Sequence, residues 1–376
     1  TSVGIFAGSL QLPLARAADL TWNGGNSSWT DSGAWLLDGS SADWINGSSA
    51  LFQTGSTLIV GSGISAAGLL YEGAAVTLNG GSLTLAGNAS GSNGGSATLS
   101  GTALTLNSAN QEDRWTVRDT SLSGSSTLTK TGNGTVTLSG THTANGTWNI
   151  NAGTLVFTGT RDITGGGQIN IASGAVLDAS GGRLFHAANY ASNWEQPTIT
   201  LNGGTLKLNQ FGYNSASLGC LQNNFYALKF SSGTTSRVII SQGYESGGTG
   251  SRGIYIAGWG TTAVIELGAN QTFTWSSSNG QNFDSIVCES GAGSALQLDV
   301  GENSVFNFDQ KFANKNTANE YGAPTTSNFS GLSLIKSGSG ELVIKRANTI
   351  SSGRVVRVDA GKLTLDVDNA FGTGSG

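Results

Sequence analysis

The chain has little of what most enzymes and metal sites are built from. Charged residues make up 11% of its 376 residues, and it contains two histidines, two cysteines, three prolines and no methionine. With two histidines there are few bases to activate a serine or cysteine nucleophile, and no cofactor is implied. No run of about 18 apolar residues is present, so nothing here spans a bilayer as a helix. The net charge is −5 and the basic residues are scattered, so nucleic acid is not expected as a partner.

What is abundant is glycine, with 58 residues, together with serine, threonine and asparagine. These residues are poor in helix interiors, whereas threonine, valine, isoleucine and the aromatic residues suit a half-buried strand, and glycine suits the turns between strands. Disordered chains can share this polar composition, but 37% of the residues are hydrophobic and they are regularly placed. The composition therefore predicts an ordered all-β fold.

The first segment differs from the rest of the chain. Residues 2–17 form an apolar run that ends in the small-x-small triplet Ala15-Arg16-Ala17, which is typical of a secretory signal and its cleavage site. We therefore expect residues 1–18 to be the remainder of a signal peptide, and the chain to be exported. The alternative is a buried first strand.

Internal repeats indicate how the strands are arranged. Thr77–Leu85 recurs almost unchanged as Thr200–Leu208, and in each copy apolar and polar residues alternate around a glycine turn. This is the period-2 pattern of strands with one buried face. In looser copies of the same pattern, Leu85 is followed by Leu106 after an interval of about 21 residues, and a period of this length predicts a solenoid.

Geometry narrows the choice among solenoids. About 21 residues reach roughly 70 Å when extended, which is enough for three short strands and three corners. Leu155 and Val176 show the same interval. We therefore predict a parallel β-helix over residues 71–376, with Leu, Val, Ile and Phe inward and Thr, Ser, Asn and Lys outward. Leu138, Ile150 and Leu155 are expected to point into its core.

The two ends of this solenoid differ in sequence. Residues 19–70 hold four of the nine tryptophans, namely Trp22, Trp29, Trp35 and Trp44. Because a solenoid end exposes apolar side chains and unpaired strand edges, we expect this segment to be an N-terminal cap with the first coils. Exposed tryptophans that bind sugars are the alternative. Phe371–Gly376 stops inside a repeat, so we expect a native chain that continues and a free last edge able to self-associate.

Two segments share a more specific pattern. The pattern is L-x-K-x-G-x-G followed by an apolar strand and a closing G-x-L, at residues 128–155 and 334–363. In the first copy it comprises Lys130, Gly132, Gly134, Leu138, Gly153 and Leu155, and in the second Lys336, Gly338, Gly340, Ile344, Gly361 and Leu363.

This pattern resembles the autotransporter-associated β-strand repeat. The second copy departs from it at Glu341, where the first has Thr135, and by two extra residues before its closing glycine. The resemblance implies a right-handed parallel β-helix that is exported and displayed on a bacterial surface, often upstream of an outer-membrane anchor. The family is defined by its scaffold, so the resemblance implies no catalytic residue.

Candidates for chemistry are few. His142 falls at a corner of the first repeat and is expected to be a solvated turn residue, and His186 is expected to have a structural or surface role. Some β-helix proteins cleave polysaccharides with paired carboxylates. The acidic residues that invite this comparison are expected to be solvated; they are Asp299, Glu302, Asp309, Asp366 and Asp368.

Binding is expected where the repeat lapses, at residues 183–196 and 209–230. Loops that interrupt a regular scaffold often carry binding, and the aromatic candidates here are Tyr190, Trp194, Phe211, Tyr213, Phe225 and Tyr226. The expected partners are extracellular glycans or proteins. Cys220 and Cys288 are expected to stay free, because the chain between them makes about three coils and places them roughly 14 Å apart.

The sequence favours a non-catalytic, exported scaffold for surface display or adhesion, because it repeats without a reactive group of residues. Two alternatives stay open: a carbohydrate-binding module with aromatic platforms, and a polysaccharide lyase or hydrolase. An open groove with convergent carboxylates and basic residues would favour the enzyme, whereas stacked aromatic residues without them would favour binding.

Overall fold

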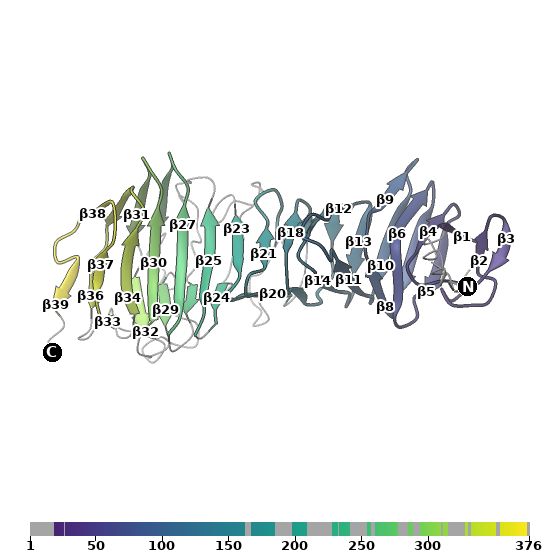
Figure 1. Ribbon diagram of the computed structural model, residues 1–376. Coiled ribbons are helices and arrows are strands. Elements are labelled where there is room, and N and C mark those ends of the chain that lie inside the picture. The colour runs from purple at the N-terminus through teal and green to yellow at the C-terminus, as the bar shows by residue number, and fades with distance from the viewer. Residues whose placement is uncertain are drawn as a thin grey trace, which may run out of the picture.

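The protein, seen as a computed structural model, is an elongated stack of β-strands that follow one another along a common axis (Figure 1). All elements of its described residues are strands, which confirms the all-β solenoid. The structure describes residues 19–25, 27–161, 167–184, 198–208, 228–231, 233–240, 254–256, 260–276, 285–288, 294–309, 311–314, 328–329, 332–350 and 354–373.

The strands form because apolar and polar residues alternate. In β7 (Ala75–Asn79), β10 (Ser96–Ser100) and β11 (Ala103–Asn107), every second side chain is buried and the others face outward. Each strand pairs in parallel with the equivalent strand of the next coil, so backbone hydrogen bonds run along the axis while the inward side chains stack into one core.

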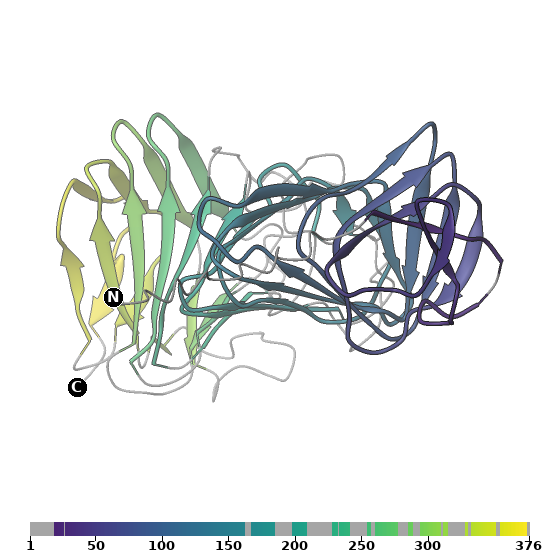
Figure 2. The same cartoon turned by 45° about the vertical axis from the view of Figure 1, so that its right-hand side comes forward.

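Each coil has up to three sides, which the turned view shows enclosing the axis (Figure 2). Long β6 (Ile64–Glu72) contributes to sides 1 and 2, since it pairs with both β8 and β9. Side 1 is formed by β8 (Ser82–Leu85), β11, β14 (Thr127–Thr131), β17 (Trp148–Ile150), β20 (Gln168–Ala172), β22 (Thr198–Asn202), β24 (Leu228–Phe230), β26 (Ile254–Ile256), β29 (Ser285–Cys288) and β32 (Lys311–Asn314), followed by β33 (Asn328–Phe329), β36 (Asn348–Ile350) and β39 (Phe371–Thr373).

The other two sides follow in chain order. Side 2 is formed by β4 (Ser48–Phe52), β9 (Ala89–Ser92), β12 (Arg114–Val117), β15 (Thr135–Leu138), β18 (Thr154–Phe157), β21 (Val176–Asp178), β23 (Thr205–Leu208), β25 (Thr235–Ile240), β27 (Thr262–Leu267), β30 (Ser294–Val300), β34 (Leu332–Ser337) and β37 (Val356–Val358). Side 3 is formed by β5 (Ser56–Ile59), β7, β10, β13 (Thr120–Ser123), β16 (Thr141–His142), β19 (Thr160–Arg161), β28 (Thr272–Ser276), β31 (Val305–Asp309), β35 (Glu341–Ile344) and β38 (Lys362–Leu365).

Coil length is close to the prediction in the N-terminal part of the solenoid, where Leu85 pairs with Leu106. The interval between Leu155 and Val176 was misleading by one position, because Leu155 pairs with Leu177. The prediction of one uniform length is wrong further along the chain. Ile169 pairs with Ile199, a coil of about 30 residues, which is still within the range of solenoid repeats.

A later coil is longer still, where Leu296 pairs with Leu334, whereas the last one is short again, where Leu334 pairs with Val356. This changes the argument about the cysteines. Phe230 pairs with Ile256, and Ile256 pairs with Cys288, so two coils take up most of the chain between the cysteines and the estimate of three was too many. Cys220 lies outside the described residues, so two free thiols stay a prediction.

The N-terminal end is closed by an antiparallel segment with a tryptophan core. β1 (Asp19–Trp22) pairs antiparallel with β2 (Trp35–Leu37), and β2 with β3 (Ser40–Ala42). Trp22, Trp29 and Trp35 are buried, and Trp44 packs against them with its ring 4.7 Å from that of Trp35. Buried rings cannot stack on a sugar, so the alternative of exposed tryptophan platforms is wrong for these three.

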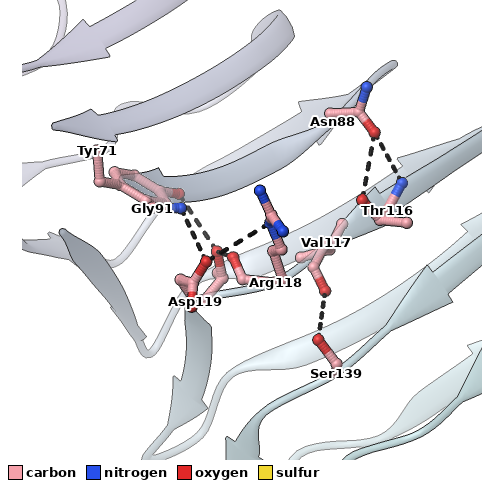
Figure 3. Close-up of polar contacts among 9 residues, drawn as sticks. Tyr71, Asn88, Gly91, Thr116, Val117, Arg118, Asp119 and Ser139 are labelled. Atoms are coloured by element: carbon pink, nitrogen blue, oxygen red, sulfur yellow. Dashed lines mark hydrogen bonds and ion pairs between the residues drawn. The ribbon is translucent and has the colours of Figure 1, made fainter. Parts of the chain in front are cut away.

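Side-chain contacts join the coils at their corners (Figure 3). The Asn88 carboxamide oxygen accepts a hydrogen bond from the backbone N–H of Thr116, 2.9 Å away, where β9 and β12 are joined by one backbone register pair. Asp119, at a φ of 55°, accepts one from the N–H of Gly91 at 3.0 Å. Polar side chains therefore continue the ladder where backbone pairing is short.

The two sequence repeats do not stand above one another. Lys130 is on β14, which belongs to side 1, whereas Lys336 is on β34, which belongs to side 2. The same shift holds for the other internal repeat, because Ser82–Leu85 is on side 1 and Thr205–Leu208 on side 2. A repeat is thus a strand–corner–strand unit that either pair of adjacent sides can accommodate.

Candidate functional site

The lysine of the first repeat is inside the solenoid. Lys130 is fully buried, and its Nζ atom donates hydrogen bonds to three backbone carbonyl oxygens: Thr131 and Gly132 at 2.8 Å, and Ala152 of the next coil at 3.1 Å. We call these three carbonyls with the ammonium the lysine cage. Burial lowers the pKa of Lys130 to about 8, and the charge of Asp113 opposes this shift.

The second repeat builds the same cage. Nζ of Lys336 donates to the carbonyl oxygens of Ser337, Gly338 at 2.7 Å and Ala360 of the next coil at 3.1 Å. Lys336 is also fully buried, and burial lowers its pKa. The prediction that lysines face outward was therefore wrong at both repeats, because an ammonium can be buried when carbonyl dipoles surround it.

The space for the lysine cages depends on glycine residues, which have no Cβ atom. A Cβ atom added to Gly361 would lie 2.8 Å from Nζ of Lys336 and 2.5 Å from the Gly338 carbonyl oxygen. One added to Gly153 would lie 2.5 Å from the Gly132 carbonyl oxygen. Both glycines also have positive φ, 62° at Gly153 and 72° at Gly361. The pattern K-x-G-x-G with a later G-x-L therefore describes one lysine cage and the close approach of two corners.

The apolar repeat positions differ between the copies. Leu138, Ile150 and Leu155 are fully buried, as the alternation predicts. Ile344 is equally buried, but Leu363 is only partly buried against the core. The second G-x-L strand thus packs less completely than the first. Gly134 and Gly340 lie at corners where a Cβ atom would meet backbone of the previous coil.

His142 lies inside the solenoid, so the prediction that it is a solvated turn residue was wrong. It is fully buried on β16. Its Nδ1 atom accepts a hydrogen bond of 3.3 Å from the backbone N–H of Leu122. Its ring lies edge-on to Trp148, with 5.7 Å between ring centroids, and 5.8 Å from Phe157. Burial lowers the pKa of His142 to about 4.

Arg161, which sequence reasoning did not single out, is the register partner of His142 in the next coil. It is fully buried, its Cζ atom lies 4.6 Å above the ring of Trp148, and Nη2 donates a 2.8 Å hydrogen bond to the Gly146 carbonyl oxygen. The aromatic face and the carbonyl stabilise a charge that burial would otherwise penalise. Its positive charge adds to the lowering of the His142 pKa.

The acidic candidates do not form a reactive group. Asp299 and Glu266 are register partners on side 2, and Arg237 forms ion pairs with both, at 3.7 Å to Asp299. Asp309 pairs with Arg346 at 2.8 Å. These carboxylates are therefore engaged by guanidinium groups instead of standing as a free pair.

The other acidic candidates are exposed, as predicted; they are Glu302, Asp366 and Asp368. Within the described part of the chain, no three His, Cys, Asp or Glu side chains come together as a possible metal site. No helix long and apolar enough to cross a membrane occurs among the described residues.

The aromatic binding candidates lie outside the described residues, and so does His186. These candidates are Tyr190, Trp194, Phe211, Tyr213, Phe225 and Tyr226. Glycan or protein binding by these residues therefore stays a prediction.

Comparison with known proteins gives a family match over the segment that contains the first lysine cage. Residues 128–157 match the passenger-associated-transport-repeat family. These residues include Lys130, the Gly132 and Gly153 corners and the strands β14, β15, β17 and β18. No curated protein and no solved structure matches the chain. The matched repeat and the stacked parallel strands fit an autotransporter passenger repeat protein.

Proposed function

Because residues 128–157 form a passenger-associated-transport-repeat, we propose that this chain is part of an exported autotransporter passenger that displays its surface outside a bacterial cell. The observation that carries the proposal is the matched repeat as an intact coil of the solenoid, with its lysine buried in a cage of carbonyls. A coil of this kind is scaffold, since its charged group holds two corners together.

Adhesion or display, rather than catalysis, is the role that we propose for this scaffold. It is supported by the pairing of Glu266 and Asp299 with Arg237, which leaves this cluster without an activated group. It is also supported by the regular outward rows of threonine on the N-terminal coils, such as Thr116 and Thr137 on side 2. A long, rigid stack holds whatever it carries at a distance from its anchor.

The test of export is the location of the folded chain. In the bacterium that produces it, antibodies against the purified chain should label intact cells, and protease added outside should remove the signal while a cytoplasmic marker survives. Labelling that appears only after the cells are permeabilised would contradict the proposal. Activity screens on acidic and neutral polysaccharides, run on the same chain, should show no turnover above that of a heat-unfolded sample.

Extracellular glycans or proteins are the partners that we propose, with residues 183–196 and 209–230 as the binding segments. A glycan array and a panel of matrix proteins would identify the ligand. Replacing Tyr190 and Trp194 by alanine should weaken that binding at least tenfold, whereas Ile59→Ala, a change at an exposed apolar residue of β5, should not. Equal binding by both variants would show that the binding site lies elsewhere on the chain.

A further inference from the structure

On side 3 of the solenoid the paired strands become short between residues 139 and 161. Strands β7, β10 and β13 on this side have four or five residues, whereas β16 and β19 have two each. The inward side chains change as well, from Leu78, Leu99 and Leu122 to His142 and Arg161. The shortest pairing of this side thus coincides with two basic side chains in the core.

The hydrogen bonds of His142 define its neutral form. Since Nδ1 accepts from the N–H of Leu122, the proton of the neutral ring is on Nε2, and Nε2 has no hydrogen-bond partner among the described residues. A second proton would have to sit on Nδ1. There it would face the Leu122 N–H. A backbone hydrogen bond with Ser139 favours the protonated ring, but it does not outweigh the effect of burial on the pKa of His142. Protonation therefore breaks the bond between β13 and β16.

The surroundings of His142 offer no compensating charge within the described residues. The ring is packed against Leu122 from β13, Trp148 from β17, Phe157 from β18 and Arg161 from β19. Of these, the charged group is the Arg161 guanidinium, which has the same sign as a protonated imidazole. A protonated His142 would thus be a second buried cation beside the first.

We propose that His142 and Arg161 make this part of the solenoid an acid-opened point, at which β16 separates from β13 and β19 while sides 1 and 2 stay paired. The opening leaves the strands next to it in place, because β14 with β17 and β15 with β18 keep their own ladders and the lysine cage of Lys130. The chain would then expose its apolar core at one place along its length in acid and close again on neutralisation. This inference does not depend on the proposed function.

The direction of the effect follows from linkage. The pKa of His142 is about 4 in the closed form and about 6.5 when the ring is in water. As pH falls below about 6.5, His142 is protonated in the open form before it is protonated in the closed form. The equilibrium constant for opening therefore increases until the pH reaches about 4, and it is constant below that pH. At pH 5 the opening equilibrium should be about 30-fold greater than at pH 7.5.

Hydrogen exchange with mass spectrometry tests this on the whole chain. Peptides that contain the amides of Thr143 and Thr160, which donate to the carbonyl oxygens of Leu122 and Gly140, should lose about 30-fold in protection between pH 7.5 and 5, after correction for intrinsic rates. Peptides from β7 and β10 on the same side should not. His142→Phe keeps an aromatic ring beside Trp148 and Phe157 and should abolish the pH dependence.

Two further outcomes decide the inference. Arg161→Met leaves His142 able to titrate but removes the charge beside it, so the loss of protection should be smaller than in the parent chain. With two histidines in the chain, the imidazole NMR signal missing from His142→Phe identifies His142. If that signal titrates near the pH of a free imidazole, or if the opening persists in His142→Phe, the acid-opened point is refuted. Should His142→Phe not fold, His186→Gln makes the assignment instead, because the imidazole signal that remains then belongs to His142.

Discussion

The N-terminal coils up to residue 161 and the coils from residue 198 onward solve the same stacking problem with different chain lengths. In the first region Val76 pairs with Ala97 and Val136 with Leu155, so a coil takes about 20 residues. In the second, Leu206 pairs with Val238 and the coil takes about 30 residues, although the last coil returns to about 20, where Leu342 pairs with Leu363. The ladder of side 2 nevertheless runs from β4 to β37 through both regions, and that of side 1 runs from β6 to β32. The register of the ladders is therefore kept while the chain length between successive rungs changes.

The outward surface changes with coil length. Along one outward row of side 2 the register passes from Thr116 and Thr137 to Lys207, Glu266 and Asp299. Charged neighbours on adjacent rungs form ion pairs in the second region, such as Arg237 with Glu266. The first region relies on close backbone contact at glycine corners, and the second adds side-chain pairs on its surface. The comparison teaches that the core register is shared and the corners are where the regions differ.

The largest expected effect comes from glycines at corners. Gly153→Ala should destabilise the first region by about 3 to 5 kcal/mol, because a Cβ atom there meets the Gly132 backbone and φ is positive. Gly260→Ala in the second region has the same sign of φ but its nearest heavy atom at 3.9 Å, so about 1 kcal/mol is expected. Urea unfolding of both variants measures the difference, and equal losses would show that the close backbone approach at Gly153 adds nothing to the cost of a positive φ.

Core leucines should give the next largest difference. Leu155→Ala should cost about 2 to 5 kcal/mol because Leu155 is fully buried, and Leu363→Ala about 1 to 2 kcal/mol because Leu363 is only partly buried. Both leucines close a G-x-L unit, so they form a matched pair. Thermal and urea unfolding of the two variants should rank them in this order. An unchanged Leu155→Ala would contradict the packing of the first repeat.

The lysine cages are where the two regions should not differ. Lys130→Met and Lys336→Met each leave three carbonyl oxygens without their donor, and each should cost about 2 kcal/mol. Lys207→Met, which removes a half-exposed lysine paired with Asp178 at 3.7 Å, should cost less than about 1 kcal/mol. A large gap between the two cage variants in urea unfolding would mean that the two cages differ in stability despite their shared geometry.

The smallest effect is expected at the surface ion pairs. Arg237→Gln should cost about 0.5 to 1 kcal/mol at low salt, and molar NaCl should remove most of that cost, since both partners are partly exposed. Arg118→Gln in the first region, where the pair with Asp119 is more exposed, should change stability by less than about 0.5 kcal/mol. A salt series of melting temperatures compares them.

Much of the fold could be predicted from residue types and spacing. Alternation around glycine turns gave parallel strands and the buried Leu138 and Leu155, and the tryptophan content of residues 19–70 gave the aromatic cluster at the N-terminal end. Coil length could not be extended from one region to the other, because the interval seen in the first copies holds only where corners are short. Backbone hydrogen bonds fix which residues of successive coils pair with each other. They set no limit on the number of residues between one paired strand and the next.

The interior charges were missed for a physical reason. Lys130 follows inward Leu128 by two positions, so alternation alone places it inside, but the general cost of burying an ammonium argued for the surface. His142 was misplaced for another reason, because its position suggested a corner of the repeat, whereas it lies on the short strand β16 and points inward. The signal that could have found the cage is the glycine pair after each lysine, because two small corner residues leave carbonyl oxygens free to surround a cation.

The shift of the two repeats between sides has a consequence for what the molecule presents to antibodies. The corner Thr131–Gly134 joins sides 1 and 2, whereas the matching corner Ser337–Gly340 joins sides 2 and 3. Two corners that share their glycines therefore point in different directions around the rod and lie at different heights along it. An antibody that recognised both corners would have to approach them from different sides of the rod.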